Sequence, residues 1–64
     1  MLPHQQRVVD EKAELDLKIE KLDKFLDSEN SENIPQKELK ILVMQSMAMQ
    51  NYSLILGARI TAFT

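Results

Sequence analysis

The sequence predicts an all-α protein: an antiparallel two-helix hairpin, coiled-coil-like, that assembles with other copies into a homo-oligomeric helical bundle. Three observations support this prediction. Apolar residues recur at alternating spacings of three and four in both halves of the chain, which is the spacing of a coiled-coil seam. A short polar segment joins halves of similar length, which favours antiparallel packing. Residues 41–64 carry a single charged side chain, Arg59, so this half has more apolar surface than one partner helix covers.

The first helix is expected from about residue 3 to residue 27. Pro3 suits a first helical turn, where its missing N–H costs nothing. The seam of this helix has one polar member, the lysine, and consists of Val8, Lys12, Leu15, Ile19, Leu22 and Leu26. Two acid–base pairs stand four residues apart in the order that stabilises a helix, by roughly 0.2–0.5 kcal/mol each: Glu14 with Lys18, and Glu20 with Lys24.

The connection is expected at residues 28–34. This segment is rich in serine and asparagine, whose side chains form hydrogen bonds with neighbouring backbone groups. We expect Asn33 to cap the second helix, with Gln36 three residues later completing a capping-box arrangement. Pro35 then belongs to the first turn of that helix.

The second helix is expected from about residue 35 to residue 62, and it is apolar on three sides. The side that faces the first helix consists of Leu39, Leu42, Ser46, Met49, Ser53, Leu56, Ile60 and Phe63. A second row consists of Val43, Met47, Leu54 and Ala58, and a third of Ile41, Met44, Ala48, Tyr52 and Ile55. Because one amphipathic helix cannot bury all three rows, we expect an interface between copies at Val43, Met47, Leu54 and Ile55.

A membrane span is the competing interpretation of this second helix, since its length would cross a bilayer. Its composition argues against insertion. Gln45, Gln50 and Asn51 interrupt the apolar run, and Arg59 lies within its far end. No tryptophan is present to anchor the helix at a membrane surface. We therefore expect no association with a membrane.

The composition excludes several classes of function. The chain of 64 residues has no cysteine, one histidine and a net charge of −2. Disulfides and thiolate metal sites are thereby excluded, and we expect no metal, no cofactor and no DNA- or RNA-coating activity. No nucleophile stands with a base at a recognisable spacing, and the carboxylates of the first helix look like a solvated face: Asp10, Glu11, Glu14, Asp16, Glu20 and Asp23. We expect no catalytic residues and no enzymatic activity.

The lack of cysteine also favours a reducing compartment. Residues 1–7 contain no apolar run of the kind that a signal peptide requires. These two observations predict a cytoplasmic protein.

A candidate ligand site lies at the open end of the hairpin. If the chain turns near Ser31, we expect Arg59 beside residues 2–7 and Tyr52 level with residues 6–12. Guanidinium groups bind phosphate in a two-pronged geometry, and a helix N-terminus favours an anion. An aromatic ring offers a stacking face for a base. The candidate phosphate- or nucleotide-binding residues are Gln6, Arg7, Lys12, Tyr52 and Arg59, contributed mostly across subunits.

A structural role for the same residues remains open. Arg59, near a helix C-terminus, is suited to interact with the helix dipole and the last carbonyl groups. Arg7 is positioned to pair with Glu11, one turn later. Lys12 is suited to set the register of the seam, as a lone polar residue at such a position does. Tyr52 is suited to an ordinary core position with its hydroxyl group at the rim.

The chain resembles a group of short phage proteins related to a crAss-like phage product. The segment from Gln5 to Leu15, followed by Lys18 to Leu22, carries the likeness in the first half. Met49, the pair Tyr52-Ser53 and the residues Leu56-Gly57, Arg59-Ile60 and Phe63 carry it in the second half. This resemblance implies a small helical phage protein.

A more distant likeness bears on function. The helical hairpin domain of phage anti-CBASS and anti-Thoeris sponge proteins is similar at Gln6-Arg7, Val9, Glu14-Leu15 and Arg59-Ile60. Those proteins oligomerise and sequester cyclic nucleotide signals of host immunity. The resemblance implies that this chain is a counter-defence sponge in the cytoplasm of an infected bacterial host. It would bind a cyclic nucleotide or a cyclic ADP-ribose-type signal, with Arg7 and Arg59 as phosphate contacts.

The chain departs from that family at two points. The family's Gly-Tyr pair in the first helix is Glu11-Lys12 here, and the aromatic start of its second helix is missing. Two other functions therefore stay open. One is a protein-interaction inhibitor or adaptor that docks its apolar second helix on a host or phage protein. The other is a minor structural protein of the virion.

Overall fold

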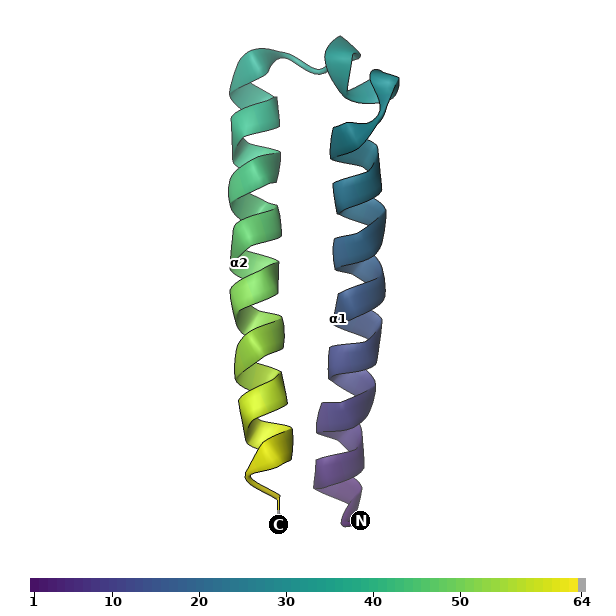
Figure 1. Ribbon diagram of the computed structural model, residues 1–64, viewed down its shortest axis with the longest axis vertical. Helices are drawn as coiled ribbons and strands as arrows, with labels where there is room; N and C mark the ends of the chain where they lie inside the picture. The colour runs from purple at the N-terminus through teal and green to yellow at the C-terminus, as the bar shows by residue number, and fades with distance from the viewer. Residues whose placement is uncertain (64) are drawn as a thin grey trace.

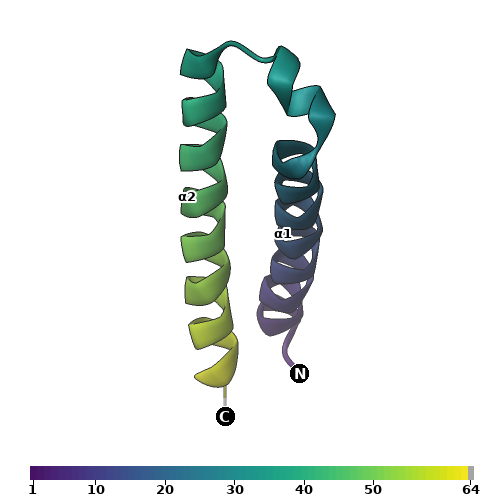
Figure 2. The ribbon, with the colours of Figure 1, turned by 45° about the horizontal axis from the view of Figure 1, so that its top comes forward.

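The computed structural model describes residues 1–63 and folds them into two long antiparallel helices. Helix α1 spans Pro3–Asp27 and helix α2 spans Gln36–Thr61, with a short 3₁₀ helix, η1, at Glu29–Asn33 between them. Together they form a rod with extents of 45 × 15 × 13 Å. The beginning of α1 and the end of α2 lie at the same end of this rod in both views (Figures 1 and 2). The predicted all-α hairpin is confirmed.

Helix α1 begins as its sequence predicts. Pro3 occupies the first helical turn, where it leaves no N–H group without a partner. The Leu2 N–H donates to Gln5 Oε1 at 2.9 Å, and the Leu2 carbonyl accepts the N–H groups of Gln5 and Gln6 at 3.0 Å each. The glutamine side chain therefore takes the part that a glutamate or glutamine has in a capping box.

Two serines shape the connection after α1. The Ser28 hydroxyl donates to the Phe25 carbonyl at 2.7 Å, so the last turn of α1 has a side-chain partner. The Ser31 hydroxyl bridges the carbonyls of Leu26 and Ser28 at 3.1 and 2.8 Å, and Ser31 is buried. Local side-chain bonds of this kind were expected for the segment. They allow η1 to turn the chain without a glycine.

The predicted cap of α2 is wrong. Asn33 is the last residue of η1, and Pro35 occupies the N-cap position of α2 without a side-chain hydrogen bond. The Pro35 carbonyl accepts the Leu39 N–H at 3.0 Å. Proline restricts φ by itself and has no N–H to satisfy, so it begins the helix by backbone geometry. Helix α2 consequently starts one residue later than expected.

The seam between the helices agrees with the predicted spacing at every position. Each expected seam residue of α1 and of α2 is buried or half-buried. Leu56 has no exposed surface and Val8 is 5% exposed, so these two are the most buried apolar side chains of the seam. Ser46 and Ser53 are buried as well, and their small side chains allow the helices to approach. Of the two predicted ion pairs along α1, Lys24 contacts Glu20 at 3.0 Å, and within residues 1–63 Glu14 and Lys18 do not form one.

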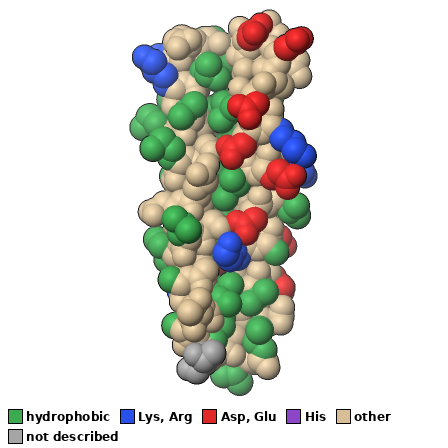
Figure 3. Space-filling model, viewed as in Figure 1, with side chains coloured by type: hydrophobic (Ala, Val, Ile, Leu, Met, Phe, Trp, Pro, Cys, Tyr) green, Lys and Arg blue, Asp and Glu red, His purple; other side chains and the backbone are tan. Residues whose placement is uncertain are grey.

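The outer sides of α2 remain exposed in a single chain. Figure 3 shows apolar side chains along the α2 edge, whereas acidic side chains gather over α1 and the turn. The exposed fraction of Leu54 is 73%. Both predicted outer rows are exposed, including Ile41, Val43, Met44, Met47, Tyr52 and Ile55. Such a continuous apolar surface is typical of an interface, and the predicted interface between copies remains a prediction.

A matched pair of leucines tests where the hairpin derives its stability. Replacing fully buried Leu56 with alanine should lower the free energy of unfolding by about 2–5 kcal/mol, because it leaves a cavity in the seam. The Leu54→Ala variant should change the stability of dilute protein by less than about 0.5 kcal/mol. Urea unfolding followed by circular dichroism measures both. Equal losses in the two variants would contradict the seam described above.

Candidate functional site

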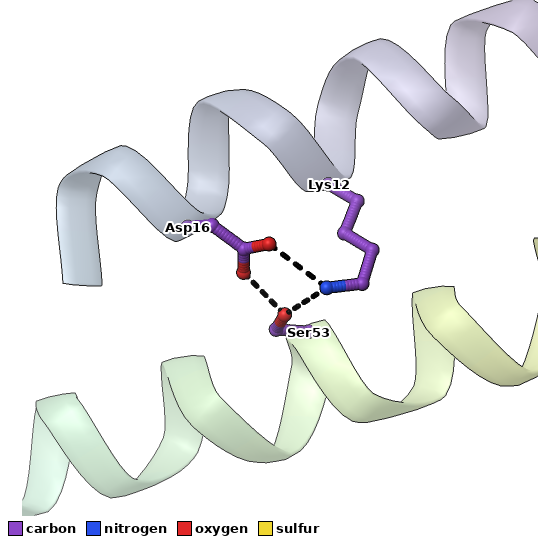
Figure 4. Close-up of polar contacts among 3 residues, drawn as sticks. All are labelled: Lys12, Asp16 and Ser53. Atoms are coloured by element: carbon purple, nitrogen blue, oxygen red, sulfur yellow. Dashed lines mark hydrogen bonds and ion pairs between the residues drawn. The ribbon is translucent and has the colours of Figure 1, made fainter. Parts of the chain in front are cut away.

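Three polar side chains meet inside the seam, between α1 and α2 (Figure 4). Lys12 Nζ donates to Asp16 Oδ2 at 2.8 Å and to Ser53 Oγ at 3.0 Å. The Ser53 hydroxyl donates to Asp16 Oδ1. The bonds from Lys12 and Ser53 favour the charged carboxylate, and they lower the pKa of Asp16 from its ordinary 3.8.

A second polar contact lies one heptad away along both helices. The Ser46 hydroxyl donates to Asp23 Oδ1 at 2.7 Å and accepts a bond from Gln50 Nε2 at 3.0 Å. Asp16 and Asp23 therefore contact serines that are themselves seven residues apart. We call these two contacts the serine–aspartate rungs. A shift of one helix along the other would break both rungs at once.

The rungs bear on two interpretations made from sequence. Asp16 and Asp23 were expected on a solvated face, and each accepts a hydrogen bond across the seam. Their places directly after the seam residues Leu15 and Leu22 were the signal that could have identified them. Lys12 was a candidate ligand contact, and its ammonium group is held inside the seam. This placement supports its alternative role in setting register.

Gly57 accommodates the Lys12 side chain. A Cβ atom at position 57 would lie 3.3 Å from Lys12 Cε, tighter than an ordinary contact. The missing side chain of Gly57 thus leaves room for the methylene groups of Lys12 over α2.

Tyr52 lies on one side of the seam, where its hydroxyl donates to a Glu11 carboxylate oxygen. This contact agrees with the expected level of Tyr52 along α1. The bond to Glu11 raises the pKa of Tyr52 above 10.0, with desolvation and the negative charge of Glu11 acting in the same direction. The positive charge of Arg59 acts in the opposite direction, so Arg59 lies close enough to influence the phenol.

Arg7 and Arg59 share this side of the hairpin. Arg7 precedes Glu11 by four residues, and Arg59 follows Tyr52 by seven, so each pair occupies one face of its helix. We call Arg7, Glu11, Tyr52 and Arg59 the open-end face. Within residues 1–63, neither arginine forms a hydrogen bond or an ion pair, and both are exposed. Sequence reasoning missed Glu11 as a member, although its spacing from Arg7 was noted.

The contacts beside Arg59 place it further along α1 than expected. Gly57 lies beside Lys12, and the Phe63 ring meets the edge of the His4 ring with centroids 6.5 Å apart. Residue 59 therefore lies level with the stretch after Arg7 and not with residues 2–7. The shift arises because η1 adds a turn to the connection, which moves the centre of the hairpin beyond Ser31.

Gln6 is not brought to the open-end face. Its Nε2 donates to Asp10 Oδ1 at 2.9 Å. Gln6 stands two residues before the seam residue Val8, and this spacing places it on the opposite side of α1. Of the five candidate ligand residues, Arg7, Tyr52 and Arg59 lie on one side of the hairpin, and Gln6 and Lys12 lie elsewhere.

Two hollows on the described part of the rod lie away from the open-end face. One is lined by Asp16, Ile19, Gln50, Ser53 and Leu54. The other lies at the turn end and is lined by Ile34, Glu38, Ile41 and Leu42. In the described part of the chain, no three histidine, aspartate or glutamate side chains converge as metal ligands. Neither helix within residues 1–63 is long and apolar enough to cross a membrane.

Comparison with known proteins places the chain in a family. The model of the family named Sequestin matches residues 2–62. The chain belongs to the Sequestin family. It is also 38% identical over 63 residues, 98% of either chain, to an uncharacterized 7.5 kDa protein in the denB–rIIB intergenic region of Enterobacteria phage T4. No solved structure matches the chain. The expected kinship with small helical phage proteins is thus supported at the level of the Sequestin family.

Tyr52 offers a direct test of the open-end face. It is the single tyrosine of a chain without tryptophan, so its ionisation dominates the ultraviolet absorbance change at alkaline pH. The Glu11→Gln variant should lower the pKa of Tyr52 towards 10.0, because the negatively charged acceptor is removed. The Glu14→Gln variant is the matched control and should titrate like the wild type. An unchanged midpoint in Glu11→Gln would contradict the contact.

The lowered pKa of Asp16 predicts that the fold becomes less stable in acid. Because the pKa of Asp16 is lowered in the folded chain, the carboxylate stabilises the fold above its unfolded pKa, and this contribution is lost as pH falls through the folded value. The melting temperature should therefore decrease below about pH 4. In the Asp16→Asn variant the melting temperature should decrease less in acid than in the wild type. In the Glu14→Gln variant it should decrease as in the wild type. Circular dichroism follows both. Identical acid profiles for Asp16→Asn and wild type would exclude this role.

Proposed function

We propose that this Sequestin-family protein is a non-enzymatic sponge, whose assembled copies bind and sequester a nucleotide second messenger of host antiviral immunity. Its place of action would be the cytoplasm of an infected bacterium. The observation that carries the proposal is the pair of exposed guanidinium groups, Arg7 and Arg59, on the side of the hairpin that carries the half-exposed ring of Tyr52. The name of the family, which denotes sequestration, and the phage origin of its relative support the same function.

The chemistry of this face suits a phosphorylated ligand with a base. Each guanidinium group can donate two parallel hydrogen bonds to a phosphate. The Tyr52 ring offers a surface on which a base stacks, worth about 1–3 kcal/mol for a single base. The bond from Tyr52 to Glu11 holds the ring in place, so less side-chain freedom is lost when a ligand binds.

The open shape of the rod supports the assembly of copies. Small-molecule sites usually enclose most of their ligand, whereas Arg7, Tyr52 and Arg59 lie on an open surface in one chain. The apolar outer sides of α2 supply a surface through which further chains can enclose the site. A protein that binds without turnover removes at most one ligand for each of its sites, so sequestration requires the protein in amounts comparable to the signal.

Calorimetric titration with cyclic dinucleotides, cyclic oligonucleotides and cyclic ADP-ribose isomers tests the proposal. We expect at least one of these ligands to bind with saturable stoichiometry. The Arg7→Ala and Arg59→Ala variants should each weaken its binding by roughly 10- to 100-fold, because a charge-assisted hydrogen bond contributes about 1.5–3 kcal/mol. The Lys37→Ala variant removes a cation from the turn end and should bind like the wild type. A folded protein that binds none of the panel would refute the proposal.

A second candidate function rests on the same exposed apolar rows of α2. A protein-interaction inhibitor would use them to dock on a host or phage protein, in the manner of a helix laid in a groove. A stoichiometric partner that displaces self-association would favour this alternative. Recovery of this protein from purified phage particles would instead favour a minor structural role in the virion.

A further inference from the structure

One exposed row of α2 is complementary to itself. Between the first and last turns of α2, residues recur at alternating spacings of three and four. They lie on the side of α2 that carries Tyr52, away from the serine–aspartate rungs. The row begins with an acid, ends with a base and has alanine at its middle: Glu38, Ile41, Gln45, Ala48, Tyr52, Ile55 and Arg59. All seven side chains are exposed in the single chain. We call this set the Glu38–Arg59 row.

Reversing the row brings its two isoleucines together and its acid to its base, with Gln45 opposite Tyr52. Laid antiparallel on a second copy about Ala48, the row pairs Ile41 with Ile55, and it pairs Glu38 with Arg59. Ala48 then meets itself, where a small side chain lets two helices approach closely. The paired residues span about 31 Å of helix, at 1.5 Å for each residue.

We propose that two copies of this chain pair antiparallel through the Glu38–Arg59 row of α2, with Ala48 at the two-fold axis and an ion pair between Glu38 and Arg59 at each end. A two-fold interface uses the same patch on both partners, as this row requires. The proposal rests on the self-assembly contained in the proposed function, and it specifies the face, the orientation and the paired residues.

A surface feature at the turn end suits this arrangement. Glu38 and Ile41 line a hollow together with Ile34 and Leu42. Its lining is apolar except for the carboxylate. An arginine side chain has the matching chemistry, because its methylene groups can pack on apolar surface while the guanidinium group reaches the carboxylate. In the antiparallel pair, Arg59 of the second copy is the residue brought to this hollow.

The helix dipole alone does not explain the row. An acid in the first turn and a base in the last turn each stabilise an isolated helix, and Glu38 and Arg59 occupy those turns. That effect places no demand on the residues between them, yet Ile41 and Ile55 also face each other across a central alanine when the row is reversed. The other exposed row, with Val43, Met47 and Leu54, leads to Lys40 at one end and has no acid at the other. Only the Glu38–Arg59 row therefore combines apolar and charge complementarity.

This pairing gives the second copy a part in the ligand site. A guanidinium group has five N–H donors in a planar fork, so Arg59 can bind the carboxylate of Glu38 and still present donors to a phosphate. Glu38 of the second copy is thus a positioning residue for Arg59. It also places the turn end of one rod beside the open-end face of the other, which encloses a site that is open in the single chain.

Charge reversal tests the pairing. Sedimentation equilibrium should show a dimer or a multiple of it for the wild type. The Glu38→Arg and Arg59→Glu variants should each weaken association by about tenfold or more, since both symmetric ion pairs become repulsive. The double variant should recover association to within about threefold of the wild type. A monomeric wild type, or a double variant no better than the single variants, overturns the proposal.

A steric pair of variants tests the two-fold axis independently. Ala48→Phe should weaken association by about tenfold or more, because two rings would meet at the axis. Ala58→Phe adds the same ring to the other exposed side of α2 and is expected to keep the wild-type dimer. Circular dichroism confirms that each hairpin remains folded. Equal association of Ala48→Phe and wild type would exclude this face.

The two proposals fail in distinguishable ways. Titration of the nucleotide panel into wild-type protein reports on the sponge function, whichever face forms the assembly. If the charge reversal fails but the wild type binds a nucleotide, the antiparallel pairing is wrong and the sponge function stands. If the charge reversal succeeds and no nucleotide binds, the pairing stands without that function.

Discussion

The structure depends on the two hydrogen bonds that serines of α2 donate to aspartates of α1. Apolar side chains at a coiled-coil spacing hold helices together, but successive layers resemble one another and leave their relative position weakly specified. Ser46 with Asp23 and Ser53 with Asp16 remove this ambiguity. A displaced register would leave the buried hydroxyl groups of Ser46 and Ser53 without their carboxylate partners, and an unpaired buried hydroxyl group is costly. The position of every residue at the open end follows from this one constraint.

The same register determines which side chains meet beyond the seam. It brings Tyr52 to Glu11 and sets Arg59 on the side of the rod that carries Arg7. The same register leaves the outer apolar rows of α2 exposed, because two helices can cover only one side of each other. A cationic face and an apolar face therefore adjoin on one small rod. This combination suits a protein that completes its binding surface with further copies of itself.

The seam spacing was sufficient to predict both helices and which rows of α2 stay exposed, and the short polar connection predicted their antiparallel packing. It could not predict how polar side chains beside the seam would be oriented. Asp16 and Glu11 each stand next to a seam position, and only the level of the opposite helix decides whether they contact it. That level depended on the connection, whose 3₁₀ turn was not anticipated and whose helix cap was predicted at Asn33 and lies at Pro35. Because the connection was predicted incorrectly, the α1 residues expected beside Arg59 were also incorrect. The prediction that Tyr52 and the arginines share one side of the hairpin did not depend on the exact relative height of the two helices.

The small number of buried residues has an evolutionary consequence. Leu56 and Val8 are the buried apolar residues among those described, and three serines complete the buried set. The hairpin by itself therefore restricts the amino acid at few positions, and an exposed leucine or methionine contributes little to its stability. A polar substitution on the outside of α2 would leave the fold intact and improve solubility. Selection that keeps this surface apolar must therefore act through what the surface contacts, so a comparison of substitution patterns inside and outside the seam would separate the history of the fold from the history of its partners.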